Sequence, residues 1–209
     1  MLKIKSYLMF LCLSIVAIFV SSCAKIYYSP DAKSLASKHQ TIALVPPTVS
    51  IAANKKVDGE AMKEQQKTES LNFQKEMHSW LLRRKMQGKI NQEILDIETT
   101  NAKLKKSGYP EIPLTSAEIC EVLGVDGILT SNFGLSKPMS DGAAVAVGIL
   151  FGAWGATNEA RVSLGIYDCD NKKLIWNYDH KYSGSVGSSP ARLVDQLMRH
   201  ASKNMPYIR

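Results

Sequence analysis

The sequence predicts an α/β fold, a single domain in which helices pack on a mixed sheet. Apolar runs typical of strands alternate with helical segments between residues 41 and 133. Two strands with alternating apolar residues then follow at 159–168 and 173–182, and a helix ends the chain. The predicted order is therefore β-α-β-α-α-β-β-β-α, with right-handed crossovers between parallel strands.

The first strand and a long helix open this domain. Residues 41–45 form an apolar run that two prolines end, and residues 48–56 are interpreted as a loop. Residues 58–87 are rich in Glu, Lys, Gln and Met, which favour a helix, and Gly88 follows as its stop. The residues of its core-facing side are Phe73, Met77, Trp80, Leu81 and Arg84.

A short strand and a second helix come next. The strand is expected at 94–97. Thr99 and Thr100 are expected to cap a lysine-rich helix, because threonine favours helix N-caps. This helix should end at Gly108, before two prolines that break the chain.

A capping box predicts the third helix. Thr115 is its N-cap and Glu118 occupies the third helical position, so that each side chain bonds a backbone N–H of the other. Gly124 ends the helix. Residues 125–133 then form a strand.

The hairpin and the final helix complete the domain. Residues 169–172 are the turn of the hairpin. At period two, the residues expected to share a face are Val162, Leu164 and Ile166 in one strand and Leu174, Trp176 and Tyr178 in the other. Ser189 caps the last helix and Pro190 begins it. Its apolar stripe is Leu193, Val194, Leu197, Met198 and Ala201.

The N-terminus predicts a lipoprotein signal peptide, residues 1–22, that is removed. Two lysines precede an apolar run over 7–20, which is shorter than the ~20 residues of a transmembrane helix. The Val-Ser-Ser-Cys sequence that ends at Cys23 resembles the lipobox of bacterial lipoproteins. In that family the cysteine thiol takes a diacylglyceryl group and a peptidase cuts just before it. The alternative is an ordinary cleaved signal, or an uncleaved anchor, with Cys23 a bystander.

The lipobox reading sets the domain organisation and the location. Residues 23–40 lack periodicity and are predicted to be a lipidated tether, and 41–209 the α/β periplasmic domain. Tyr27 and Tyr28, within the tether, either sit at the membrane interface or pack on the domain. By resemblance to lipoprotein sorting, Ala24 after the cysteine favours the outer membrane, and we expect the protein to face the periplasm.

Charge and composition exclude some classes of function. The chain has 26 Lys and Arg against 19 Asp and Glu, and loss of Lys3 and Lys5 with the signal lowers the net charge from +7 to +5. No basic block with interleaved aromatic residues is present, so no nucleic-acid partner is expected. A mildly basic domain suits anionic lipid or cell-wall polymer.

Two cysteines remain in the mature domain, Cys120 and Cys169. In an oxidising compartment they could pair, or both could be small buried apolar residues. Because Cys120 lies in an apolar helix stripe and Cys169 in a turn, we predict that they do not pair. The four histidines have no cysteine or carboxylate at ligand spacing, and neither metal nor cofactor is expected.

Four sequence stretches resemble a known group. They are "TIALVPP", "EVLGVDGILTSNFG", "VSLGIYDCDNKKLIWNYDHKY" and a final helix ending in "MPY". With the lipobox, they resemble the periplasmic lipoproteins related to the TolB N-terminal domain and the curli secretion channel subunit, over roughly residues 41–207. Asn171 and Lys172 stand where that group usually has glycine. The resemblance implies binding or assembly rather than catalysis.

Residues 142–156 contain no polar side chain. As a helix they span ~22 Å, short of a bilayer core of ~30 Å, and place small residues on one face. As a strand they alternate large and small residues, and a protein like the curli channel inserts strands at a comparable place. We predict that the segment contacts the membrane or another subunit, through Ala144, Gly148, Phe151, Gly152 and Trp154. The alternative is packing within the domain or a loop that covers the sheet.

Several carboxylates have both a functional and a structural interpretation. Asp126 either touches a ligand at the sheet edge or, as we expect, bonds nearby backbone N–H groups. Asp168, Asp170 and Asp179 surround the hairpin, where solvated carboxylates are commoner than a cation site.

A hydrolase would need a nucleophile and a base. Ser188 or Ser189 with His180 or His200 is the pairing the sequence offers. Neither serine lies in a G-x-S-x-G nucleophile elbow.

The sequence therefore predicts a non-enzymatic, lipid-anchored periplasmic protein, a scaffold or accessory of envelope or secretion machinery. Its expected partners are the membrane, through acylated Cys23, and either a further copy of itself or an envelope protein. The alternatives are an oligomeric pore-forming secretion-channel subunit that inserts residues 142–156 and, third, an envelope hydrolase.

Overall fold

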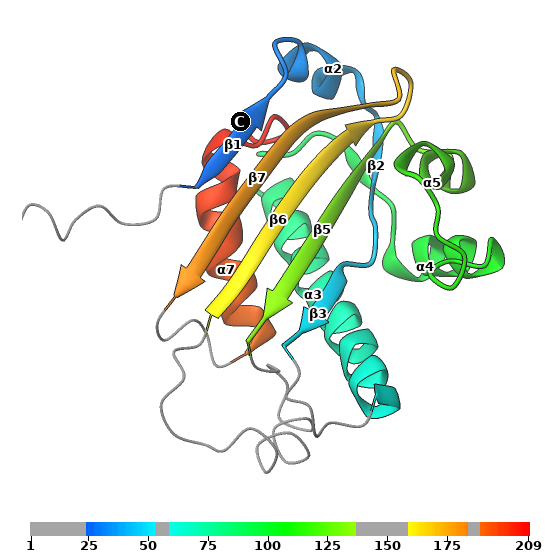
Figure 1. Ribbon diagram of the computed structural model, residues 1–209. Coiled ribbons are helices and arrows are strands. Elements are labelled where there is room, and N and C mark those ends of the chain that lie inside the picture. Colours follow the sequence, from blue (N-terminus) through cyan, green and yellow to red (C-terminus); the bar gives the residue numbers. More distant parts are fainter. Residues whose placement is uncertain (1–23, 53–58, 137–158, 184–188) are drawn as a thin grey trace, which may run out of the picture.

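The computed structural model describes residues 24–52, 59–136, 159–183 and 189–209, and these form an α/β fold (Figure 1). A mixed sheet of seven strands has the order β1-β7-β6-β5-β2-β4, and β3 also pairs with β5. The strands are β1 (Lys25–Tyr28), β2 (Thr41–Leu44), β3 (Thr48–Ile51), β4 (Glu93–Ile94), β5 (Gly127–Leu135), β6 (Glu159–Asp168) and β7 (Lys173–Ser183). The predicted fold class is confirmed.

The helices lie on both faces of this sheet. They are α2 (Ala32–Lys38), α3 (Gly59–Met86), α4 (Ile97–Lys106), α5 (Ser116–Leu123) and α7 (Pro190–Ala201), with a 3₁₀ turn at Ser202–Asn204. Helices α3 and α7 pack behind the sheet in Figure 1, and α4 and α5 lie beside β2. Among the described residues, none of these helices is long and apolar enough to cross a bilayer.

The larger core lies between the sheet and helices α3 and α7. Phe73 of α3 stacks on Phe133 of β5, with ring centroids 4.0 Å apart. The predicted stripes of α3 and α7 are buried here, except for Arg84, which lies over the Trp80 ring. A second cluster joins α4 and α5 to the opposite face of β2 and β5. The parallel strands are thus covered on both faces, as is usual for parallel pairs.

The segment expected to be a tether contains two elements of the fold. Strand β1 pairs antiparallel with β7, from Lys25 opposite Asp179 to Tyr28 opposite Trp176. Helix α2 follows it and buries Ala32 and Ala36 completely. Two alanines four positions apart are a weak apolar signal, and an edge strand needs little apolar alternation, so the segment reads as irregular.

Residues 48–51, which the sequence places in a loop, form strand β3. Val49 and Ile51 are buried, while Thr48 and Ser50 point to solvent. Strands β2 and β3 pair in parallel with successive parts of β5, so the two prolines between them interrupt the ladder without ending it.

The predicted hairpin is confirmed, but the prediction that Leu174 shares the buried face is wrong. Trp176 and Tyr178 are buried, whereas Leu174 is 42% exposed. The register of β6 and β7 shifts between Ile166 and Tyr167, which inserts Ile175 as an extra residue. This bulge turns Leu174 to the opposite face of the sheet from Trp176.

The helix caps are partly as predicted. Thr115 and Glu118 form the capping box, and Gly124 ends α5 in the left-handed conformation. Helix α4 is capped by Asp96, whose carboxylate accepts from the backbone N–H of Thr99. Thr99 and Thr100 are therefore inside the helix, because Asp96 supplies the acceptor that an N-cap requires.

Candidate functional site

The positions predicted to contact membrane or partner lie outside the described residues. They are Cys23, Ala144, Gly148, Phe151, Gly152 and Trp154. The structure shows which described residues lie next to these positions in the chain.

The two residues that flank 137–158 are bonded to each other at one end of the sheet. The backbone N–H of Ser136 donates to the carbonyl of Glu159 at 2.9 Å, and the N–H of Glu159 donates to Ser136 Oγ at 2.8 Å. The same end of the sheet carries the last residue of β3 and the last of β7, because Ile51 pairs with Leu135 and Glu159 with Ser183. The residues on either side of 137–158 therefore lie at the ends of adjacent antiparallel strands, β5 and β6.

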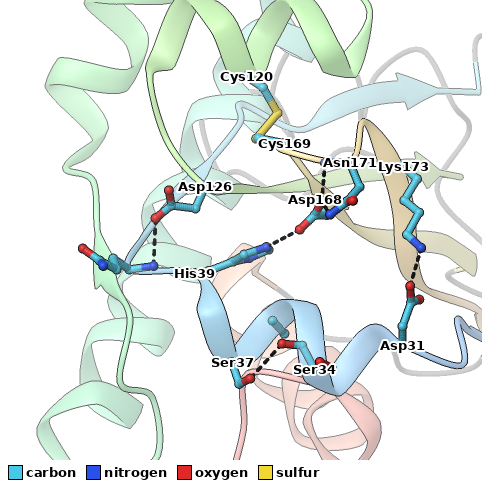
Figure 2. A network of polar contacts seen from close by, with 12 residues as sticks. Asp31, Ser34, Ser37, His39, Cys120, Asp126, Asp168, Cys169, Asn171 and Lys173 are labelled. Carbon is cyan, nitrogen blue, oxygen red and sulfur yellow. Dashed lines mark hydrogen bonds and ion pairs between the residues drawn. A yellow bond between two sulfur atoms is a disulfide. The ribbon is translucent and has the colours of Figure 1, made fainter.

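A buried polar cluster lies at the opposite end of the sheet, where β6 ends. His39 Nε2 lies 2.7 Å from Asp168 Oδ2 (Figure 2), and His39 Nδ1 lies 2.6 Å from the hydroxyl of Tyr207. His39 follows α2, Asp168 is the last residue of β6, and Tyr207 lies near the C-terminus. All three side chains are buried. The cluster therefore joins the residue after α2 and the C-terminal segment to the hairpin.

The hydrogen bonds determine the role of each member. Burial tends to raise the pKa of Asp168, but bonds from His39 and from Asn171 outweigh it and hold that pKa below its usual range. The carboxylate accepts the Nε2–H of His39. Burial, together with the charges of Asp168 and Asp126, raises the pKa of Tyr207, so its hydroxyl keeps its proton and donates to Nδ1.

This cluster contains a carboxylate, an imidazole and a hydroxyl, with a tyrosine in place of the serine of a catalytic triad. Both ring nitrogens of His39 have partners inside the cluster, and all three side chains are buried, so among the described residues the imidazole faces no open cavity through which an outside group reaches it. Its chemistry is therefore that of a closed, satisfied polar network, which specifies how the elements pack.

Gly127 is required where the cluster meets β5. A Cβ at this position would fall against the Tyr207 hydroxyl and within 2.5 Å of His39 Nδ1. Glycine at this strand position allows the close approach of both rings.

Asp126 has the structural role that the sequence favours. Its Oδ2 accepts from the backbone N–H groups of Gln40 and Thr41, both at 2.8 Å. Figure 2 shows it beside the segment of His39. Asp126 therefore holds the start of β2 against the start of β5.

The prediction that Cys120 and Cys169 stay unpaired is wrong. They form a disulfide that joins α5 to the residue after Asp168 (Figure 2). Cys120 is buried in the apolar stripe, as expected, but the turn at Cys169 folds back onto that stripe. Spacing along the chain carried no sign of this approach.

The remaining hairpin carboxylates do not converge. Asp168 is buried, contrary to the expectation of a solvated turn residue, because it serves His39 and Asn171. Asp170 and Asp179 are exposed. Within the described ranges, no group of three or more Cys, His, Asp or Glu is placed to hold a metal ion.

The predicted nucleophile and base are not brought together. Ser188 lies outside the described residues, and Ser189 begins α7 without a side-chain cap bond. His180 packs between the rings of Tyr178 and Tyr182 on β7. Burial, and secondarily the charge of His200, lowers the pKa of His180.

Comparison with known proteins gives fold-level likenesses. No family model and no curated protein matches the chain. Among solved structures, the PelC dodecamer from Paraburkholderia phytofirmans is 10% identical, covers 90% of this chain and 99% of its own, and has a TM-score of 0.40. Lipoprotein GNA1162 from Neisseria meningitidis is 11% identical, with coverages of 79% and 99% and a TM-score of 0.41.

The C-terminal domain of LpoB from Salmonella enterica is also similar, at 10% identity. Its match covers 72% of this chain and 94% of that one, with a TM-score of 0.34. At these identities and TM-scores, the likenesses assign neither a family nor a function. The resemblance to the TolB N-terminal domain and to curli channel proteins stays a prediction.

Proposed function

We propose that this protein is a lipid-anchored, periplasm-facing protein of the outer membrane that acts by binding or assembly and not by catalysis. The observation that carries the proposal is the start of the fold. Strand β1 begins at Lys25, two positions after Cys23, so an acyl group on that cysteine would attach the sheet itself to the bilayer. Several acyl chains on one residue give a stable anchor, because each buried methylene contributes ~0.8 kcal/mol.

The closed polar network supports a non-catalytic role. The His39 cluster brings a carboxylate, an imidazole and a hydroxyl together, and it is buried with both imidazole nitrogens bonded. Ser189, the hydroxyl offered by the sequence, makes no bond with His180 or His200 among the described contacts. A hydrolase would need an open arrangement of such groups.

Replacement of the cysteine tests the anchor. Cys23→Ser removes the thiol that takes the diacylglyceryl group, so we expect loss of labelled fatty acid and release from the membrane fraction. Cys12→Ser is the matched control, because Cys12 lies within the signal peptide and should leave labelling intact. Equal labelling of wild type and Cys23→Ser would refute the lipoprotein assignment.

A second candidate is an oligomeric pore-forming channel subunit that uses residues 142–156. The observation in its favour is the bonded pair Ser136 and Glu159, the described residues on either side of the stretch that contains this segment, at the ends of adjacent antiparallel strands. An apolar segment in that position suits insertion in a membrane or contact with a second copy.

Oligomer size separates the two candidates. Replacing Gly148 and Gly152 with Leu blocks close approach of neighbouring segments. A channel subunit should then give a smaller particle in mild detergent at unchanged thermal stability. Unchanged size with a collapse of stability would place both glycines inside the monomer. Leu71→Ala, on the exposed side of α3, is the control that should change neither quantity.

A further inference from the structure

Strand β1 presents an exposed edge with apolar side chains. It is the terminal strand of the sheet and pairs only with β7 among the described strands. Ile26 is 41% exposed and Tyr27 is 51% exposed, and as consecutive strand residues they lie on opposite faces. Together they flank the free edge of β1 on both sides.

The chain before β1 restricts where this edge can be. Two residues span at most about 7 Å, so the backbone of Lys25 lies within that distance of Cys23. The headgroup layer on each side of a bilayer is about 5 to 8 Å thick. If Cys23 is acylated, which rests on the proposed function, the start of β1 lies within about 7 Å of the lipidated residue, next to the headgroups.

We propose that the free edge of β1 lies in the headgroup region of the bilayer, with Tyr27 and Ile26 as its contacts. Tyrosine favours this region because it has an apolar ring and a polar hydroxyl. Covering the edge with lipid headgroups also protects the unpaired backbone groups of an edge strand from pairing with other chains.

Electrostatics contributes little to this contact. Lys25 stands opposite Asp179 in the register, and Asp31 is paired with Lys173, so each of these two charges has an opposite charge beside it. The contact therefore depends on Ile26 and Tyr27 and should form on zwitterionic lipid. It also orients the sheet, with β4 and helices α4 and α5 at the edge away from the membrane (Figure 1).

A nitroxide at position 27 tests the contact. Tyr27→Cys gives a single reactive thiol, because Cys120 and Cys169 are bonded and Cys23 is expected to be acylated. Ile112→Cys is the matched control, an apolar residue 58% exposed in the turn between α4 and α5. The full-length protein, purified from membranes, is placed in phosphatidylcholine vesicles, and collision of each nitroxide with oxygen and with a nickel chelate is measured.

We expect position 27 to lose accessibility to the nickel chelate and to gain accessibility to oxygen, while position 112 stays accessible to nickel. Vesicle-bound protein with equal nickel accessibility at both positions would overturn the inference and leave the anchor intact. Dipolar broadening between copies at position 27 would also overturn it, because a second copy would then cover the edge. Failure of the wild-type protein to carry fatty acid and to float with vesicles would overturn the proposed function.

Discussion

Removal of the His39 side chain should destabilise the fold strongly. In His39→Ala, Oδ2 of Asp168 loses its partner, while Oδ1 keeps the two bonds from Asn171. The Tyr207 hydroxyl loses its acceptor as well. A buried group left unsatisfied costs about 1 to 3 kcal/mol, and more where it is charged, as Asp168 is, so the two groups together cost about 3 to 5 kcal/mol. A typical domain has a free energy of unfolding of about 5 to 15 kcal/mol, ~10 kcal/mol in the middle of that range. We therefore expect His39→Ala to remove a large part of the stability.

Urea unfolding at neutral pH measures this loss, and two variants apportion it. Tyr207→Phe leaves only His39 Nδ1 without a partner, so its cost should be about 1 to 3 kcal/mol. Asp168→Asn in the His39→Ala background removes the orphaned charge and should recover part of the stability. The two changes are therefore expected to be non-additive, as residues in one network are.

The same network predicts a pH dependence. Because the folded pKa of Asp168 lies below its unfolded value of about 3.9, its bonds stabilise the fold above that pH. This stability is lost as the pH falls through the lowered folded pKa. Asp168→Asn should lack this part of the acid loss. A His39→Ala cost under about 1 kcal/mol, with the same acid profile in Asp168→Asn as in wild type, would refute the reasoning.

Three further predictions concern the core and its cross-link. Replacing Cys120 and Cys169 with Ala opens a link across 49 positions, which the chain-entropy relation puts at about 4 kcal/mol; a cost near zero in urea unfolding would argue against the bond. Trp176→Ala should cost about 3 to 5 kcal/mol, because the ring is fully buried, and a loss under ~1 kcal/mol would place it outside the core. Gly127→Ala should lower the stability by about 1 to 3 kcal/mol through overpacking, whereas Gly59→Ala, with open space around it, should not; equal effects would contradict the close approach.

Local patterns account for the elements that the sequence predicts well. The capping box of Thr115 and Glu118 and the stripe of α7 are decided by residues within a few positions of one another. The long helix α3 has the same basis. Where one face of a helix is buried, its apolar residues recur at helical spacing in the sequence.

Elements that depend on distant partners were missed. Three of the four residues of strand β1 are exposed, and the strand forms because β7 provides it with hydrogen-bond partners. In the sequence, the Pro46–Pro47 pair indicates the end of a strand. In the structure, β3 follows it and pairs with the same neighbour as β2, namely β5.

The polar cluster shows the same limit in side-chain chemistry. His39 and Asp168 are 129 positions apart, and His39 and Tyr207 are 168 apart. No spacing rule connects such residues, and each has an ordinary local interpretation. The disulfide is not predictable from spacing for the same reason, since α5 and the hairpin turn meet only in the folded chain. The glycine of the "GVDGIL" stretch, Gly127, was the one local sign of a close approach at this end of the sheet.

The pairing of β1 with β7 has a consequence in time. Tyr28 of β1 is paired with Trp176 of β7, which lies about 150 positions later in the sequence. Ribosomes add about 5 to 20 residues per second. Strand β1 must therefore wait on the order of ten to thirty seconds of synthesis before its neighbour exists. Once β7 arrives, the ladder closes and β1 becomes the edge strand of the sheet.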